Sequence, residues 1–334
     1  MDGQGEVLMR GVIATSAANL QAACRGLQGP VQVVVEEGTL AAWAREVLAP
    51  VVREVVICNP RVNHLLRVGN KTDQGDAEKL ATLLRLQAIK RVYKVAAHLQ
   101  ELQELVRAYE MLVQDVTRCK NRLKALYRGR GISAAGRTIY QAKQRASYLA
   151  QLTDRGRRRR AEWLYAELNA LQALRKQAKR EMVQASAKCP EQRWLLSIPG
   201  IGPVRAAQLL ASLGTAERFR TKRQLWSYSG LAVRVRTSSE YELRQGELKR
   251  KTRNVQTLGL THEFNHRLKA VFKGAAEEAR RRAPFQAYYE SLVAKGMRAE
   301  MARLTLARKL ATIVWKLWRT GTEFRAGEIK SVAP

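Results

Sequence analysis

Within the first seventy residues, two patterns of apolar positions alternate. Short runs rich in Val and Ile, typical of strands, occupy residues 6–13, 31–35 and 51–57. Apolar residues at helical spacing occupy residues 16–27 and 40–48, with Thr15 or Ser16 as the N-cap of the first helix. Strands that alternate with helices predict an α/β layer.

A heptad pattern starts at Leu99 and continues for four repeats. Its positions are three and four residues apart in turn, and only one of them is charged: Leu99, Leu102, Val106, Tyr109, Val113, Val116, Lys120, Leu123 and Tyr127. This spacing predicts one long helix that packs along a coiled-coil seam. Gly129 and Gly131 end it, and a helical pattern returns until Pro190.

The stretch Ile198-Pro199-Gly200-Ile201-Gly202-Pro203-Val204 predicts a helix-hairpin-helix. Gly200 and Gly202 would let backbone N–H groups approach a phosphate, and Pro203 would start the second helix. A purely structural pair of helices is the alternative. The alternation through Val233 and Val235 then predicts a strand with Arg234 and Arg236 facing outward, followed by Ser238 and Ser239. Serines in loops are usually caps or turn formers.

Charge divides the chain into two parts. Sixty Lys and Arg residues against 29 Asp and Glu give a net charge of +31, which indicates a polyanionic partner, either nucleic acid or an acidic membrane. Residues 1–70 contain six acids and six bases, so the whole excess lies in residues 71–334. No apolar run is long enough to predict a membrane span, and the four scattered cysteines are typical of reduced thiols in a cytoplasmic protein.

Two aspartates stand at the start of a predicted helix. Asp73 and Asp76 are three residues apart and therefore share a helix face, with Thr72 or Asp73 as the N-cap. Carboxylates so placed repel each other, take up a proton or share a hard divalent cation, and helix-dipole complementarity alone is the simpler explanation. Glu36 and Glu37 follow a predicted strand, at the edge where α/β sheets place ligands.

The segment His262-Glu263-Phe264-Asn265-His266 matches the HExxH pattern of zinc peptidases. No third histidine follows at the spacing of the longer zinc motif, and the surrounding sequence is rich in Lys and Arg. We therefore set the peptidase hypothesis aside.

Two blocks in this order, Lys71-Thr72-Asp73-x-x-Asp76-Ala77 and the later IPGIGPV…GL…SS, resemble the DEDD transposases of bacterial insertion sequences of the insertion sequence 110 type. The resemblance covers nearly the whole chain. It implies an α/β ribonuclease-H-like (RuvC-like) domain in residues 1–95 and a long helical coiled coil in residues 96–190. A mainly α transposase domain with a helix-hairpin-helix follows in residues 191–334.

The resemblance also implies roles for particular residues. Asp73, Asp76 and Glu37 would bind Mg²⁺ or Mn²⁺, with Glu37 preferred over Glu36 because Trp43 then also falls at a matching position. The nucleophile would be Ser238 or Ser239. The residues expected to bind nucleic acid are Lys71, Gly200, Gly202, Arg234 and Arg236.

The function implied is DNA transposition or site-specific recombination by a bacterial, cytoplasmic homo-oligomer, a dimer or tetramer, guided by a structured RNA. The family's first catalytic aspartate belongs on a strand upstream of the Asp2-Gly3-Gln4-Gly5 turn, and Asp2 is a poor substitute for it. A metal-dependent nuclease acting on branched DNA and an inactive nucleic-acid-binding remnant are the alternatives.

Overall fold

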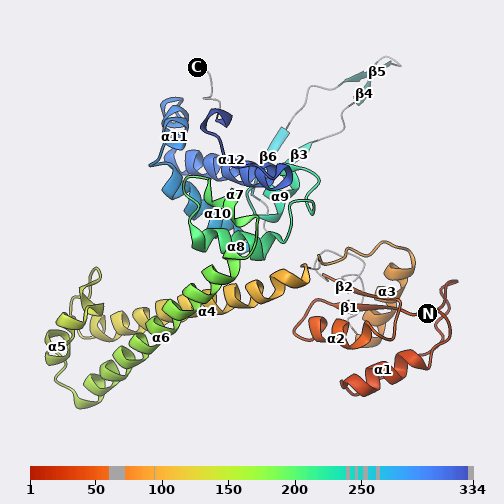
Figure 1. The fold of residues 1–334 in the computed structure, drawn as a ribbon, viewed down its shortest axis with the longest axis horizontal. Coiled ribbons are helices and arrows are strands. Elements are labelled where there is room, and N and C mark those ends of the chain that lie inside the picture. The colour runs from red at the N-terminus through yellow and green to blue at the C-terminus, as the bar shows by residue number, and fades with distance from the viewer. Residues whose placement is uncertain are drawn as a thin grey trace. The chain divides into compact units, whose positions relative to one another are not determined.

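The computed structural model describes residues 1–59, 72–93, 95–237, 241–244, 247–250, 255–260 and 264–329. The chain divides into two compact units, Met1–Lys94 and Val95–Pro334 (Figure 1). Each unit has its own core, so each is described by itself.

The first unit is a small α/β layer. Its elements are α1 (Ala17–Arg25), β1 (Gln32–Glu36), α2 (Ala41–Leu48), β2 (Glu54–Cys58) and α3 (Asp73–Arg85). Strands β1 and β2 pair in parallel, from Gln32 opposite Glu54 to Glu36 opposite Cys58, and α2 connects them. The core contains Val56, Cys58, Leu80, Leu83 and Ile89. The predicted order of strands and helices from residue 16 onward is confirmed, whereas the ribonuclease-H-like assignment stays a prediction.

The strand predicted at residues 6–13 is wrong. This segment has no regular secondary structure, and its apolar side chains are exposed, with Val12 at 92% and Leu8 at 66%. A strand requires hydrogen bonds to a neighbouring strand. In the described part of this unit the sheet consists of β1 and β2 alone, and residues 6–13 pair with neither. A strand-like pattern of apolar residues is therefore not enough to predict a strand, because the pattern does not show whether a pairing strand is present.

The second unit begins with two long helices. Helix α4 (Ala97–Arg128) and helix α6 (Arg155–Ala187) are joined by η2 (Thr138–Tyr140) and α5 (Ala142–Ala150). They run antiparallel, because Leu102 packs with Met182 in one core cluster while Leu123 packs with Leu164 in another. We call this pair the helical hairpin, and its end with η2 and α5 the distal end (Figure 1). The single long helix predicted from the heptad pattern is confirmed.

The rest of the second unit is a helical body. Its helices are α7 (Gln192–Leu196), α8 (Pro203–Leu213), α9 (Lys222–Tyr228), α10 (His266–Ala279), α11 (Phe285–Ala294) and α12 (Ala299–Thr320), followed by η3 (Ala326–Glu328). Helix α12 is central: it packs against α7, α9, α10 and α11, and Leu306, Leu310, Val314 and Leu317 on it are fully buried. The near end of the hairpin joins the same core through Leu99, Leu102 and Val106.

Among the described residues of this unit, four short strands form two antiparallel pairs. Strand β3 (Val233–Thr237) pairs antiparallel with β6 (Val255–Leu260), and β4 (Tyr241–Arg244) pairs antiparallel with β5 (Glu247–Arg250). The strand predicted through Val233 and Val235 is therefore confirmed. All four cysteines are free, and among the described helices none has the length and apolar content needed to cross a membrane.

Candidate functional site

The predicted acidic pair lies at the start of α3. Thr72 is the N-cap, and its Oγ1 accepts a hydrogen bond from the N–H of Gly75 at 3.2 Å. Asp73 is therefore the first residue of the helix and is exposed, and Asp76 follows in the same turn. The cap fixes where the helix begins, and so it places both carboxylates at the positive end of the helix dipole.

Asp76 is the more enclosed of the two aspartates. Its side chain is 28% exposed, and its Oδ1 is buried without a hydrogen-bond donor among the described residues. The Nζ of Lys79 lies 3.5 Å from this same Oδ1 and forms an ion pair with it. This ion pair offsets part of the cost of burying a carboxylate oxygen without a hydrogen bond, and a divalent cation bound at that oxygen would offset more.

Glu36 and Glu37 lie at the carboxyl end of β1. Glu36 is opposite Cys58 in the sheet, and the N–H of Glu37 donates to the carbonyl of Cys58 at 2.8 Å. Burial, together with the negative charges of Glu36 and Glu37, raises the pKa of the Cys58 thiol to about 11. Helix α3 packs against β1, so the two elements that carry the predicted metal ligands are neighbours in this unit.

The donor chemistry at α3 suits a hard divalent cation, because it consists of carboxylate oxygens, one of them buried and unsatisfied. Among the described residues, however, no group of three or more His, Cys, Asp or Glu side chains is close enough together to hold a metal ion. The structure thus places Asp73 and Asp76 in the same helix turn but does not add Glu37 to them. Glu37 as the third ligand stays a prediction.

Asp2 has a structural role in the turn where it lies. Its Oδ1 accepts hydrogen bonds from the N–H groups of Gln4, Gly5 and Glu6, each at 2.9 Å. The bond from Glu6 is the largest of the effects that lower the pKa of Asp2. This carboxylate is already used by its own turn, and its exclusion from the metal site stays a prediction.

The two glycines of the predicted helix-hairpin-helix differ in what surrounds them. Gly200 is buried with φ +95°, and a Cβ there would lie 2.7 Å from the carbonyl oxygen of Ala275 on α10. Close packing against α10 therefore explains why this position is glycine. Gly202 is the N-cap of α8, and a Cβ there would meet open space. Of the two, Gly202 is the better placed to face a ligand.

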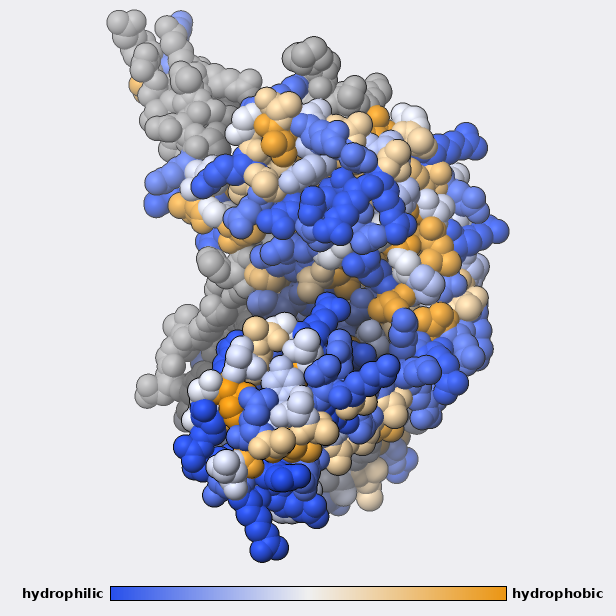
Figure 2. Space-filling view, turned by 90° about the vertical axis from the view of Figure 1, so that its left-hand side faces the viewer, coloured by the Kyte–Doolittle hydropathy of each residue, from blue (hydrophilic) through white to orange (hydrophobic). Residues whose placement is uncertain are grey.

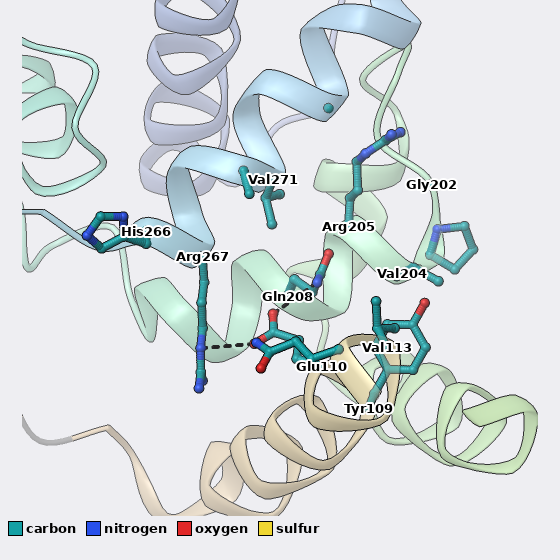
Figure 3. Close-up of a pocket in the computed structure, with 14 residues that line it drawn as sticks. Tyr109, Glu110, Val113, Gly202, Val204, Arg205, Gln208, His266, Arg267 and Val271 are labelled. Atoms are coloured by element: carbon teal, nitrogen blue, oxygen red, sulfur yellow. Dashed lines mark hydrogen bonds and ion pairs between the residues drawn. The ribbon is translucent and has the colours of Figure 1, made fainter. Parts of the chain in front are cut away.

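Gly202 borders a cavity of about 660 Å³ between α4, α8 and α10 (Figure 3). Val113, Val204 and Val271 form apolar walls, and Arg205 and Arg267 stand at its edge. The first turn of α8 lines the cavity, and N–H groups in the first turn have no acceptor within their own helix. Pro203 has no N–H, and Glu110 also lines the cavity. The cavity therefore combines apolar walls with paired charges and the backbone donors of the residues after Pro203.

A polar bridge crosses one side of this cavity. Glu110 of α4 accepts a hydrogen bond from Gln208 Nε2 of α8 at 3.0 Å, and its Oε2 lies 3.1 Å from Arg267 Nε of α10 (Figure 3). On the other side, Arg205 Nη1 donates to the carbonyl of Gly200 at 2.9 Å. Sequence reasoning missed this bridge, since its members lie far apart along the chain and no local pattern connects them.

The ribbon that leads to the predicted serines is fixed at its base. Gly230, with φ +64°, precedes β3, and a Cβ there would lie 2.4 Å from the ring of Phe264. Arg308 of α12 donates from Nε to the carbonyl of Leu231 at 2.6 Å, and burial lowers the pKa of this guanidinium. Arg308 was also missed from the sequence, because nothing local distinguishes it from other helical arginines.

Beyond this base, β3 carries Arg234 and Arg236, and both are exposed. This agrees with the outward orientation predicted for them. Ser238 and Ser239, as well as Lys71, lie outside the described residues. Their roles stay predictions.

The structure also argues against the zinc-peptidase pattern. That motif needs both histidines on one face of a single helix. Helix α10 begins only at His266, with Asn265 as its N-cap, and Phe264 before it is not helical. His262 and Glu263 lie outside the described residues.

Comparison with known proteins identifies the class. A transposase family model of the IS110 group matches residues 1–129, and a model described as the transposase IS116/IS110/IS902 family matches residues 192–290. The transposase for insertion sequence element IS1111A of Coxiella burnetii is 28% identical over 265 residues, which cover 77% of this chain and 69% of that protein. A probable family 20 transposase of Pseudomonas aeruginosa is 27% identical over 311 residues, covering 89% and 87%.

The transposase for insertion sequence element IS1328 of Yersinia enterocolitica is 23% identical over 305 residues, covering 88% of this chain and 86% of that protein. These matches define an insertion-sequence transposase. The chain belongs to the IS110 type of this class.

Proposed function

We propose that this transposase cuts and rejoins DNA strands with a serine nucleophile at a carboxylate site for a divalent metal. The buried, unsatisfied Oδ1 of Asp76, beside Asp73 in the first turn of α3, is the observation that carries the proposal. Lys79 gives Asp76 one ion pair, and a divalent cation shared by both carboxylates would relieve the repulsion that remains between them.

Asp73 and Asp76 would hold Mg²⁺ or Mn²⁺, with Glu37 as the expected third ligand. The ion, when bound, would neutralise charge on the DNA phosphate under attack. The hydroxyl of Ser238 or Ser239 forms a new bond to phosphorus and gives up its proton, and the bond from phosphorus to the leaving deoxyribose oxygen breaks. The product is a phosphoserine linkage that a second DNA strand can later displace.

The basic second unit is expected to hold the nucleic acid. The cavity beside Gly202 and the exposed Arg234 and Arg236 offer phosphate contacts on the body and on the ribbon. A structured RNA as guide, and a homo-oligomer in which the serine of one protomer serves the carboxylates of another, complete the proposal. A serine nucleophile must come within about 3–3.5 Å of the phosphorus, which makes its distance from the acidic pair the quantity to determine.

The direct test uses DNA that spans the ends of the insertion sequence, together with RNA transcribed from the element. Asp76→Ala should reduce metal-dependent cleavage by more than about 100-fold, since even partners that only orient metal ligands are worth 10–100-fold. The melting temperature should change little, because the substitution removes a partly buried carboxylate together with its ion pair to Lys79, and these two effects have opposite signs. Glu78→Gln is the matched control: it changes an exposed acid of the same helix, ion-paired with Arg10, and should leave cleavage intact.

A covalent protein–DNA adduct trapped from the wild-type protein, and lost in Ser238→Ala/Ser239→Ala, would support the serine mechanism. Cleavage without any adduct would instead favour the branched-DNA nuclease. Unchanged cleavage in Asp76→Ala would remove the metal site from the proposal.

A further inference from the structure

Several cations surround one tyrosine at the distal end of the helical hairpin. The Nζ atoms of Lys120 and Lys124 on α4 lie 5.0 and 5.7 Å from the ring centroid of Tyr140 in η2. The hydroxyl of Tyr140 donates to the backbone carbonyl of Lys120 at 3.2 Å, which fixes the ring against α4. The two ammonium groups are therefore held on the same ring rather than spread in solvent.

Two arginines add to this concentration of charge. Burial lowers the pKa of Lys120, and the positive charges of Arg175 on α6, Arg137 and Lys124 lower it further. Arg137, Arg175 and Lys124 are therefore close enough to Lys120 to repel its ammonium group. We call Lys120, Lys124, Arg137, Arg175 and Tyr140 the Tyr140 cluster.

None of the four cations of the Tyr140 cluster has an ion pair with a carboxylate in the described part of the chain. Other cations of α4 are neutralised: Arg107 pairs with Glu104, Arg118 with Asp115, and Arg122 with Glu167 of α6. The hairpin thus provides acids for one set of cations on α4, and the described residues provide none for the other. The difference is local and does not follow merely from the high charge of the whole chain.

A run of repelling cations that the fold leaves without acids is suited to an external polyanion. Lys120, Lys124 and Arg128 follow one another along α4 at intervals of four residues, about 6 Å of helix rise. Arg128 also lies near the cluster, since its charge acts on the hydroxyl of Tyr140. A linear array of charge suits a linear chain of phosphates. On the face that carries the distal end, hydrophilic residues predominate, with apolar residues interspersed among them (Figure 2).

We propose that the Tyr140 cluster is a binding site for the phosphodiester backbone of nucleic acid, formed by residues other than the carboxylates of α3 and the lining of the cavity beside Gly202. DNA and RNA both carry this backbone, and they are the two possible sources of the ligand. The site goes beyond the proposed strand cleavage, because it would position nucleic acid on the hairpin rather than react with it.

The test compares two triple variants of the full chain with equal loss of charge. Lys120→Gln/Lys124→Gln/Arg175→Gln removes unpaired cations, whereas Arg107→Gln/Arg118→Gln/Arg122→Gln removes ion-paired ones. Fluorescence anisotropy measures binding of duplex DNA, single-stranded DNA and a stem-loop RNA, each over a series of salt concentrations. In a plot of the logarithm of the binding constant against the logarithm of the salt concentration, the slope should become shallower by about 2–3 in the first variant. In the second variant it should change by less than about 1.

The probe on which this loss occurs identifies DNA or RNA as the ligand. Equal slope changes in the two variants on every probe would overturn the proposal, since the charge would then act diffusely. The proposal would also fail if the first variant lost binding only to anionic phosphatidylserine vesicles. Failure of the wild-type protein to bind any nucleic acid would contradict the proposed transposition itself, so the two failures are distinguishable.

Folding is checked by thermal denaturation. The first variant should melt close to the wild-type temperature, because the relief of repulsion and the loss of two cation–π contacts with Tyr140 have opposite effects. If it melts earlier, Lys124→Glu alone retains the contact of Lys120 with Tyr140, and this single change should still lower the salt slope by at least 1. An unchanged slope in Lys124→Glu would overturn the proposal.

Discussion

The two units differ in how much core supports their candidate sites. In the first unit a two-stranded sheet and α3 bury a small apolar cluster, while Leu8, Met9, Val12 and Ile13 stay exposed. In the second unit α12 is surrounded by other helices, and a continuous core extends into the near end of the hairpin. The predicted metal ligands thus lie on the thinly packed unit and, apart from Lys71, the proposed nucleic-acid contacts lie on the well-packed one. The stability of the chain and its chemistry are therefore expected to respond to different substitutions.

The largest expected effect comes from shortening a core leucine in each unit. Leu310→Ala on α12 should cost about 2–5 kcal/mol of unfolding free energy in the second unit, and Leu83→Ala on α3 should fall at or below the low end of that range. A smaller core collapses more readily around the lost atoms. Hydrogen exchange measured by mass spectrometry reports on both units in one sample. Equal losses, or a loss in Leu310→Ala that spreads to residues 1–94, would show that the units do not unfold independently.

A smaller effect is expected at the turn before α8. Gly200→Ala would place a Cβ against the carbonyl of Ala275 in a left-handed backbone conformation, at a cost of about 1–3 kcal/mol in strain. Gly202→Ala, where a Cβ meets open space, is the matched control for the fold. If Gly202→Ala lowers DNA affinity without lowering the melting temperature while Gly200→Ala does the reverse, packing and binding are divided between the two glycines as the structure indicates. Reversed results would contradict that division.

The smallest expected effect lies at the cap of α3. Thr72→Ala should cost the first unit about 1 kcal/mol, because the N–H of Gly75 loses its acceptor, whereas Thr72→Ser should retain most of the stability. Denaturant titration of both variants, followed by hydrogen exchange in α3, measures the difference. A cleavage rate that falls in Thr72→Ala and recovers in Thr72→Ser would link the start of this helix to the orientation of Asp73 and Asp76. Equal stability of the two variants would mean that the cap contributes little.

The sequence allowed correct predictions where the structure depends on residues that are close together in the chain. Thr72 caps α3, Pro203 starts α8 and the glycines after Arg128 end α4, each by chemistry within a few residues. The segment 6–13 was predicted wrongly because a strand depends on a partner that lies elsewhere in the chain. Lys120 was the one charged position of the predicted seam, and only the fold shows that its charge lies beside Tyr140.

The candidate sites also contain some features that follow from local sequence and others that depend on tertiary packing. The pairing of Asp73 with Asp76 follows from helical periodicity, whereas the unsatisfied oxygen of Asp76 appears only once the surrounding residues are in place. Glu110, Gln208 and Arg267 come from three helices and meet only through tertiary packing. Gly200 shows that a motif glycine predicted to face a phosphate can owe its identity to a neighbouring helix.

The fixed base of β3 limits how far the strand can tilt, and so limits the displacement of the residues at its other end. Five residues of strand extend about 16 Å, so a tilt of about 10° at the base would displace Thr237 by about 3 Å. That displacement is as large as the separation between a nucleophile and the atom it attacks. The close packing of Gly230 against Phe264 and the hydrogen bond from Arg308 to Leu231 therefore hold the base of β3 and limit its tilt. The position of the proposed serine nucleophile would therefore depend on contacts in the helical body, at the far end of β3 from the serine.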